Sequence, residues 1–143
     1  SKWIVCYSSS ILEDGGRQSK YTSFDIVETF NRYNMFACPE ELVGMPGIGF
    51  VEGMACGTAY IGLDHDMYRC LGLVPGYHYI AYDGTLSNMI DVIRYYQNEP
   101  EKLREIAVNG TNYVRENFNN EIIAEKFEQQ LLQSYKKYIS NGR

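Results

Sequence analysis

The sequence predicts an α/β fold with a parallel sheet of about four strands, flanking helices and a helical carboxyl-terminal tail. Four short runs rich in β-branched and aromatic residues lie at positions 3–7, 34–38, 58–61 and 78–82. Helical candidates separate these runs, and such alternation is typical of parallel strands joined by right-handed crossovers. From Thr85 onward apolar residues recur at helical spacing. We therefore expect an α/β core over 1–84 and helices over 85–143.

Size and composition indicate one globular domain and argue against several kinds of partner. The 143 residues are 45% hydrophobic and 22% charged, which is ordinary globular usage and enough for a single core. A net charge of −5 gives no source for the phosphate attraction that drives nucleic-acid binding. No apolar run approaches the roughly 20 residues that span a bilayer. We expect a cytoplasmic protein, or one peripheral at a membrane, without a transmembrane segment and without a nucleic-acid partner.

The first 40 residues are expected to form a strand, a polar loop, a helix and a second strand. The strand at 3–7 begins almost at the first residue, which suggests the second half of a larger sheet. Thr22 or Ser23 is a candidate cap for the helix that follows. The apolar residues of this helix recur at helical spacing and are Phe24, Val27 and Phe30. Pro39 ends the next strand because it cannot donate to a sheet ladder.

A short helical candidate at 67–71 separates the last two strands, and three helices follow them. Their expected apolar faces are Leu86, Met89, Ile90 and Ile93; Leu103, Ile106, Ala107 and Val114; and Ile123, Phe127, Leu131 and Tyr138. Their expected start signals are Thr85 or Ser87 as a cap, Pro100 in a first turn, and Asn119 or Asn120 as a cap.

The cysteines and the possible metal-ligating residues of the sequence indicate neither a disulfide nor a metal site. The four cysteines form no Cys-x-x-Cys pair, and we interpret them as reduced core thiols. Asp64, His65 and Asp66, with Cys70 one turn later, are ligand types that a divalent ion accepts. Three successive side chains diverge in direction, so we expect no metal here.

A glycine-rich loop precedes Glu52 and has two interpretations. Glycines between a strand and a helix let backbone N–H groups approach a phosphate, and the helix start adds about half a positive charge. The same Gly-x-Gly spacing over 44–49 also suits an ordinary tight turn. Glu52 falls in the first helical turn, where the dipole stabilises a carboxylate with or without a ligand. An acid there can also accept charge-assisted hydrogen bonds from the vicinal hydroxyls of a ribose.

Residues 52–61 resemble a known family signature. The stretch Glu52-Gly53-Met54-Ala55-Cys56-Gly57-Thr58-Ala59-Tyr60-Ile61 is similar to the Glu-(Ala or Gly)-Met-Ala-Cys-Gly-x-Pro-Val-Ile motif of retaining glycosyltransferases with the GT-B fold. The strand from Tyr33 to Pro39 resembles the one that precedes the donor loop in that family. The turn at 83–86 and the three last helices also fit the family, so the resemblance covers almost the whole chain, 1–143.

The resemblance implies a Rossmann-like, carboxyl-terminal domain that binds the nucleotide-sugar donor of a hexosyltransferase-type enzyme. It implies a second, amino-terminal acceptor-binding domain outside this chain, no metal or other cofactor, and no activity for the piece alone. Residues implied to bind the donor diphosphate or sugar are Gly44, Met45, Pro46, Gly47, Ile48, Gly49, Phe50 and Val51. Glu52 is implied to bind the ribose, and Tyr7, Ser8 and Ser9 to lie near the base.

Departures from the family motif leave two alternatives open. The family's first acid should fall at Val43 or Gly44, where there is none, and Glu40 or Glu41 is a possible substitute. The catalytic residues therefore stay unknown at this point. One alternative is a nucleotide-sugar epimerase of the same fold, and the other is a degenerate transferase-like module kept for binding or assembly.

Overall fold

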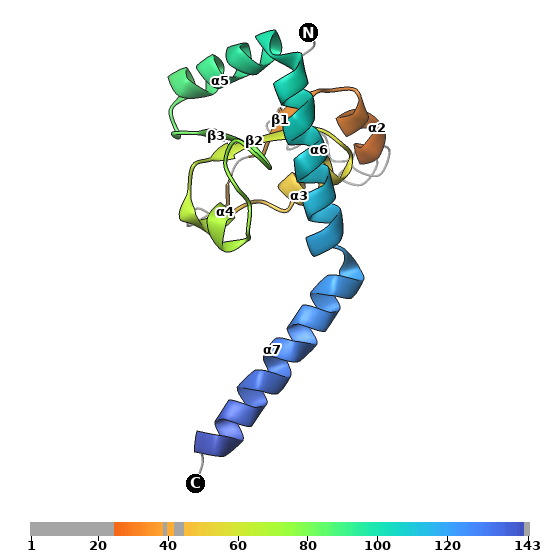
Figure 1. Ribbon diagram of the computed structural model, residues 1–143, viewed down its shortest axis with the longest axis vertical. Helices are drawn as coiled ribbons and strands as arrows, with labels where there is room; N and C mark the ends of the chain where they lie inside the picture. Colours follow the sequence, from red (N-terminus) through yellow and green to blue (C-terminus); the bar gives the residue numbers. More distant parts are fainter. Residues whose placement is uncertain (1–24, 39, 42–44, 142–143) are drawn as a thin grey trace, which may run out of the picture.

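The computed structural model describes residues 25–38, 40–41 and 45–141, and it contains a parallel sheet (Figure 1). The strands are β1 (Met35–Ala37), β2 (Ala59–Leu63) and β3 (Ile80–Tyr82), in the order β1-β2-β3. Met35 pairs with Ala59, and Ile61 pairs with Ile80. The described sheet thus has three strands instead of about four, because the predicted strand at 3–7 lies outside the described residues.

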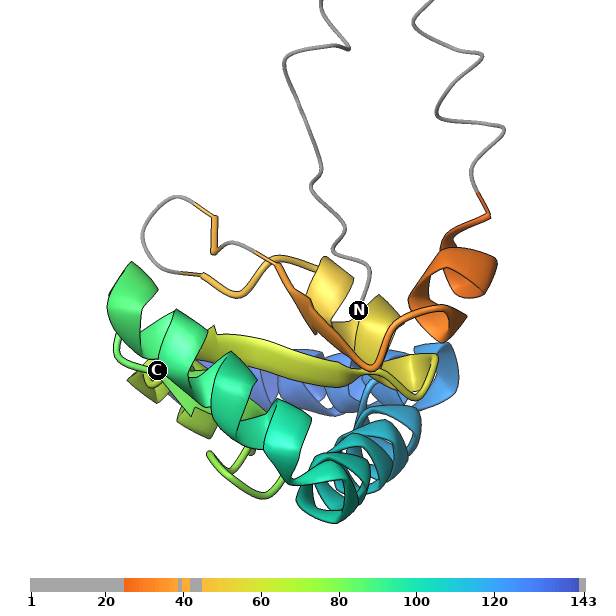
Figure 2. The same ribbon diagram turned by 90° about the horizontal axis from the view of Figure 1, so that it is seen from above.

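The central strand β2 is buried on both faces and divides the core in two. On one face Tyr60 belongs to a cluster with Phe50, Met54, Tyr68, Leu73, Tyr79 and Val114. On the other face Ala59 and Ile61 pack with Ile80, Leu103 and Ile106. Figure 2 shows α3 on one side of the strands and α5 and α6 on the other. A strand covered on both faces explains why this run is almost continuously apolar.

Two of the three described short helices before and between the strands begin at a residue whose side chain caps the helix. Helix α2 (Ile26–Asn31) starts after Asp25, whose carboxylate accepts from the Glu28 N–H at 2.9 Å. The expected cap at Thr22 or Ser23 is therefore wrong. Helices α3 (Gly49–Ala55) and α4 (Asp66–Cys70) follow β1 and β2.

Two longer helices, α5 (Leu86–Asn98) and α6 (Pro100–Asn117), pack on the sheet. The expected cap at Thr85 is confirmed, since its hydroxyl accepts from the Asn88 N–H at 3.2 Å, and Pro100 is confirmed in the first turn of α6. The expected apolar face of α5 is partly wrong. Leu86 is 72% exposed, whereas Met89, Val92, Ile93 and Tyr96 pack against the core.

Helix α7 (Asn120–Asn141) leaves the rest of the molecule after a bend and stands clear of it (Figure 1). Asn119 is its cap, because the Asn119 side chain accepts from the Ile122 N–H at 2.9 Å. Ile123, Phe127, Leu131 and Tyr138, the expected core face, are all exposed. Among the helices within 25–141, none is both long and apolar enough to cross a bilayer.

The cysteines only partly follow the expectation of core thiols. Cys38 and Cys56 are half-buried, but Cys70 is exposed at the end of α4. The prediction is wrong for Cys70 because this short helix turns only its tyrosine inward. Cys6 lies outside the described residues.

Candidate functional site

The three strands are parallel, so their carboxyl ends share one edge, and we call the segments that leave it the carboxyl edge. The described residues of these segments are Cys38, Glu40 and Glu41 after β1, 64–66 after β2 and 83–86 after β3. In open α/β sheets ligands bind outside the carboxyl ends of the strands. This edge is therefore the candidate site.

The loop before α3 reaches this edge through Cys38. The Cβ of an alanine at Gly49 would lie 3.0 Å from the Cys38 Sγ, so the start of α3 packs against the end of β1. The Phe50 N–H donates to the Gly47 carbonyl at 3.1 Å, and the Val51 N–H donates to the Ile48 carbonyl at 3.1 Å. These two amides are therefore already used within the turn. Ile48 precedes them and is 74% exposed.

Glu52 is in the first turn of α3, as expected, and its side chain is exposed. Across the described ranges its carboxylate makes no side-chain hydrogen bond and no ion pair. Its neighbours in the signature, by contrast, include several residues with clear packing roles. No described packing contact or hydrogen bond therefore requires a glutamate at position 52.

The glycines and small residues of the signature are explained by packing. A Cβ at Gly53 would lie 2.3 Å from the Phe36 ring, so only glycine lets α3 approach β1 this closely. Met54 is buried, and Gly57 has φ of +89° just after the helix, where glycine commonly ends a helix. The Thr58 hydroxyl donates to the Phe30 carbonyl at 2.9 Å, which ties β2 to α2.

Three carboxylates lie within electrostatic reach of Cys38. Burial raises the pKa of the Cys38 thiol, a hydrogen bond with the Gly49 backbone lowers it, and the charges of Glu40, Glu41 and Glu52 raise it further. The two acids after β1 and the acid of α3 therefore gather around the end of that strand. Glu40 and Glu41, the expected substitutes for the family's first acid, both lie at this edge.

Glu40 joins two strands and α4 through a hydrogen-bond network that sequence reasoning missed. Its Oε1 accepts from the Leu63 N–H at 3.2 Å and from the Tyr68 hydroxyl at 2.9 Å. The Tyr68 and Tyr60 hydroxyls are 2.6 Å apart, and Tyr60 also donates to the Cys38 carbonyl at 3.2 Å. Burial raises the pKa of both tyrosines, and the Glu40 charge raises it further. Both hydroxyls therefore stay protonated, and the Tyr68 hydroxyl holds Glu40 in place.

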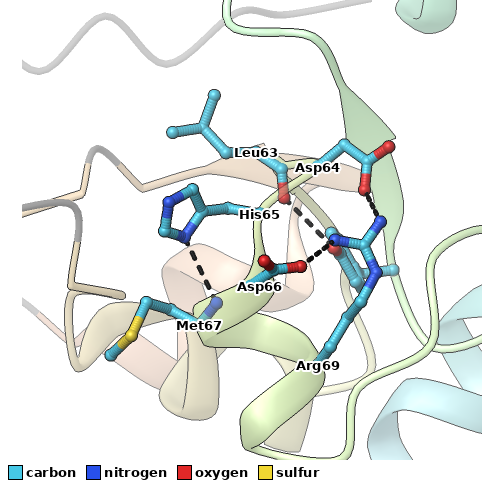
Figure 3. Close-up of polar contacts among 7 residues, drawn as sticks. Leu63, Asp64, His65, Asp66, Met67 and Arg69 are labelled. Atoms are coloured by element: carbon cyan, nitrogen blue, oxygen red, sulfur yellow. Dashed lines mark hydrogen bonds and ion pairs between the residues drawn. The ribbon is translucent and has the colours of Figure 1, made fainter.

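The two acids after β2 share ion pairs with one arginine (Figure 3). Arg69 forms ion pairs with Asp64 and with Asp66, the latter at 3.1 Å. His65 points away from them, and its Nδ1 accepts from the Met67 N–H at 3.2 Å, which caps α4. Within the part of the chain that the structure describes, no group of three or more His, Cys, Asp or Glu residues could hold a metal ion.

The structure places some of the predicted site residues and leaves others undescribed. Met45 to Val51 and Glu52 lie before and within α3, but the Phe50 ring is 4% exposed and belongs to the core. Gly44, Tyr7, Ser8 and Ser9 lie outside the described residues.

Comparison with solved structures shows which fold this is. The chain is similar to a sucrose-phosphate synthase from Thermosynechococcus elongatus, with a TM-score of 0.63 and 22% identity over 76% of this chain. The match covers 27% of that structure, so the chain spans about a quarter of its length. No protein-family model matches the chain, and neither does any curated protein. The likeness shows the fold alone, which is an α/β arrangement with a Rossmann-like parallel sheet.

Proposed function

We propose that this chain is the carboxyl-terminal, donor-binding domain of a hexosyltransferase-type glycosyltransferase. In this proposal it binds a nucleotide-diphosphate sugar whose sugar is transferred to an acceptor. The observation that carries it is Glu52, an exposed carboxylate beside the carboxyl edge with no hydrogen bond or ion pair from its side chain among the described residues. The GT-B-like fold and the resemblance of 52–61 to the family signature support the same assignment.

The proposed roles follow from which groups are available. Glu52 accepts hydrogen bonds from the ribose hydroxyls, as charge-assisted bonds that fix the orientation of the donor. The backbone N–H groups of Met45, Gly47 and Ile48 stabilise the diphosphate as negative charge builds on it. Pro46 has no N–H, and the N–H groups of Phe50 and Val51 already donate within the turn. The one described cation in 64–69, Arg69, is paired with two acids. The scheme therefore relies on backbone dipoles and includes no metal or other cofactor.

The proposal includes a partner, the acceptor-binding domain of the same protein. The chain spans 27% of its structural neighbour, so the remaining length of such an enzyme has room for that domain. Closure of the two domains excludes water and clamps the donor, which is the condition under which fixed dipoles act strongly. The chain alone is therefore expected to bind donor nucleotides without turning them over.

A ligand titration tests the ribose role of Glu52. The chain is titrated with nucleoside diphosphates by calorimetry and by NMR, and signals of residues 47–52 are expected to shift. Glu52→Gln should weaken binding about ten- to a hundredfold, because a hydrogen bond to a charged group is worth roughly 1.5–3 kcal/mol. Glu105→Gln, at an exposed acid of α6, is the matched control.

The ligand supplies a second control that isolates the ribose. A 2′,3′-dideoxynucleoside diphosphate lacks the hydroxyls, so it should bind the wild type and Glu52→Gln equally. The proposal fails if millimolar nucleoside diphosphate perturbs none of residues 47–52, or if Glu52→Gln weakens both ligands alike. Product analysis on a longer protein that contains this chain separates transfer from epimerisation. If the Glu52→Ala variant of that longer protein keeps its turnover, and pulldowns recover the same protein partner each time, the degenerate binding or assembly module is favoured.

A further inference from the structure

Glu40 lies at the carboxyl edge as a half-buried acid that is held by two other segments of the chain. Its Oε1 accepts from the N–H of Leu63, the last residue of β2, at 3.2 Å. The same oxygen accepts from the hydroxyl of Tyr68, a buried residue of α4, at 2.9 Å. By contrast, Glu41 and Glu52 are exposed. The Glu40 carboxylate is thus committed to contacts within the protein.

Two tyrosine hydroxyls form a chain of hydrogen bonds that ends on Glu40. Each hydroxyl has one hydrogen to donate, and Tyr68 donates its hydrogen to Glu40. The hydrogen in the 2.6 Å contact between the two hydroxyls therefore comes from Tyr60, which shares it with the Cys38 carbonyl at 3.2 Å. Both O–H dipoles then point along the chain toward the carboxylate. Hydrogen bonds in such a chain, which ends on a charged acceptor, strengthen one another.

This network anchors the described ends of the loop before α3. The chain enters the loop directly after Glu40, where the Glu41 N–H donates to the Met45 carbonyl at 2.8 Å. The chain leaves the loop at Gly49, where an added Cβ would lie 3.0 Å from the Cys38 Sγ. The Cys38 carbonyl belongs to the same network. Cys38 and Glu40 therefore fix where the loop and the first turn of α3 lie relative to β2.

We propose that Glu40 is a positioning residue of the donor site, an inference that rests on the proposed function. Glu40 holds the amides over 45–48 and the Glu52 carboxylate in the geometry that binds the donor, and it acts through the Leu63 N–H and the two tyrosines. This role needs an acceptor oxygen at position 40 and does not need the negative charge. It therefore differs from the role of the family's first acid, for which Glu40 is one of the two expected substitutes.

Glu40→Gln and Glu40→Ala separate the acceptor oxygen from the charge. Glutamine keeps a carbonyl oxygen that can accept from both donors, whereas alanine removes it. In the ligand-free chain, the NMR amide signals of Leu63 and of residues 45–52 should stay close to those of the wild type in Glu40→Gln and should move in Glu40→Ala. In a titration with nucleoside diphosphate, Glu40→Ala should weaken binding about tenfold and Glu40→Gln by less than about threefold, because misplaced binding groups are costly.

Tyr68→Phe removes the other partner of the same hydrogen bond and keeps the ring in the core. It should also weaken binding, and adding Glu40→Ala to it should cost less than Glu40→Ala costs in the wild type, because the two residues share one contact. Tyr138→Phe, at a ring that is 78% exposed, is the matched control and should leave binding unchanged. If Glu40→Ala does not fold, the signals and the affinity of Tyr68→Phe decide the test.

Two results would overturn the positioning role. One is a Glu40→Gln chain that loses as much affinity as Glu40→Ala, which would mean that the charge itself contacts the ligand. The other is a Glu40→Ala chain that is less stable in urea but keeps its signals over 45–52, which would mean that Glu40 supports the fold alone. A wild-type chain that binds no nucleoside diphosphate overturns the proposed function instead. The signals of the ligand-free chain then still decide whether Glu40 positions residues 45–52.

Discussion

Gly53 and Gly62 illustrate how single residues let large rings fill the space beside the sheet. A Cβ at Gly53 would lie 2.3 Å from the Phe36 ring, and one at Gly62 would lie 2.6 Å from the Tyr60 ring. The space at Gly53 lets Phe36 pack edge-to-face on Phe30, with ring centroids 4.9 Å apart. The space at Gly62 lets the Tyr60 ring lie along its strand, from which its hydroxyl reaches Tyr68.

Gly53→Ala is expected to destabilise the protein by about 1–3 kcal/mol, the usual cost of overpacking a core. The cause is the Phe36 ring, so the same change in a Phe36→Ala background should cost nothing, or gain up to about 1 kcal/mol of helix propensity. Urea unfolding of the four chains of this double-mutant cycle measures the coupling. An equal loss in both backgrounds would contradict the steric explanation.

Tyr79 should make stability fall at alkaline pH. Its hydroxyl donates to the Leu63 carbonyl at 3.1 Å, and burial, followed by the Asp64 charge, raises its pKa to about 12. The folded pKa lies above the ordinary value of about 10, so this contribution to stability is complete below pH of about 10. It is lost as pH rises toward about 12.

Urea midpoints between neutral and strongly alkaline pH measure this effect. Tyr79→Phe should make the alkaline decline shallower without abolishing it, because burial also raises the pKa values of Tyr60 and Tyr68. Tyr138→Phe is the matched control, since that ring is 78% exposed. An identical alkaline slope for Tyr79→Phe and the wild type would rule out the proposed role of Tyr79.

At the scale of elements, α6 holds α3 in position below the candidate site. The Thr111 hydroxyl is buried and lies 2.8 Å from the Met54 carbonyl and 2.6 Å from the Ala107 carbonyl. Arg115 adds two hydrogen bonds to the Ala55 carbonyl, at 3.2 and 2.7 Å. These contacts tie the carboxyl end of α3 to a helix far along the chain, so the position of Glu52 depends on α6.

Thr111→Val should cost about 0.5–1.5 kcal/mol, because it keeps the shape of the side chain but removes the hydrogen bond from the Thr111 hydroxyl to the Met54 carbonyl, which then accepts only from the Gly57 N–H at 3.0 Å. Thr111→Ser is the matched control, since serine keeps the hydroxyl and loses only the methyl group. Thermal and urea unfolding of both variants give the comparison, and the valine variant should be the less stable of the two. A serine variant that loses as much stability as the valine variant would mean that packing, and not the hydrogen bond, explains the change.

At the scale of the whole molecule, the strand order gathers the loops and α7 remains apart from them. Parallel pairing in the order β1-β2-β3 brings residue 38, residues 40–41, 64–66 and 83–86 to one edge, although at least one complete strand separates the segments after β1, β2 and β3 in the sequence. The same topology buries β2 on both faces with helices from before and after it in the chain. Helix α7 adds little to that core, and most of its large apolar side chains are exposed.

Local patterns in the sequence determined much of this architecture. The runs at 34–38, 58–61 and 78–82 are confirmed as strands with slightly different ends, and Thr85 and Pro100 are confirmed at helix starts. The first-turn position of Glu52 is also confirmed. These features depend on neighbours within a few residues, so periodicity and capping chemistry are sufficient to predict them.

Only the tertiary structure decided which faces are covered and which polar groups meet. The hydrogen bond between Glu40 and Tyr68 spans 28 residues, and the one between Thr111 and Met54 spans 57. The apolar faces of α6 and α7 have similar patterns, yet α6 is buried and α7 is exposed. An apolar stripe indicates that a helix face can be buried. Which segment covers that face depends on packing between residues far apart in the sequence, and a short stretch of sequence does not determine it.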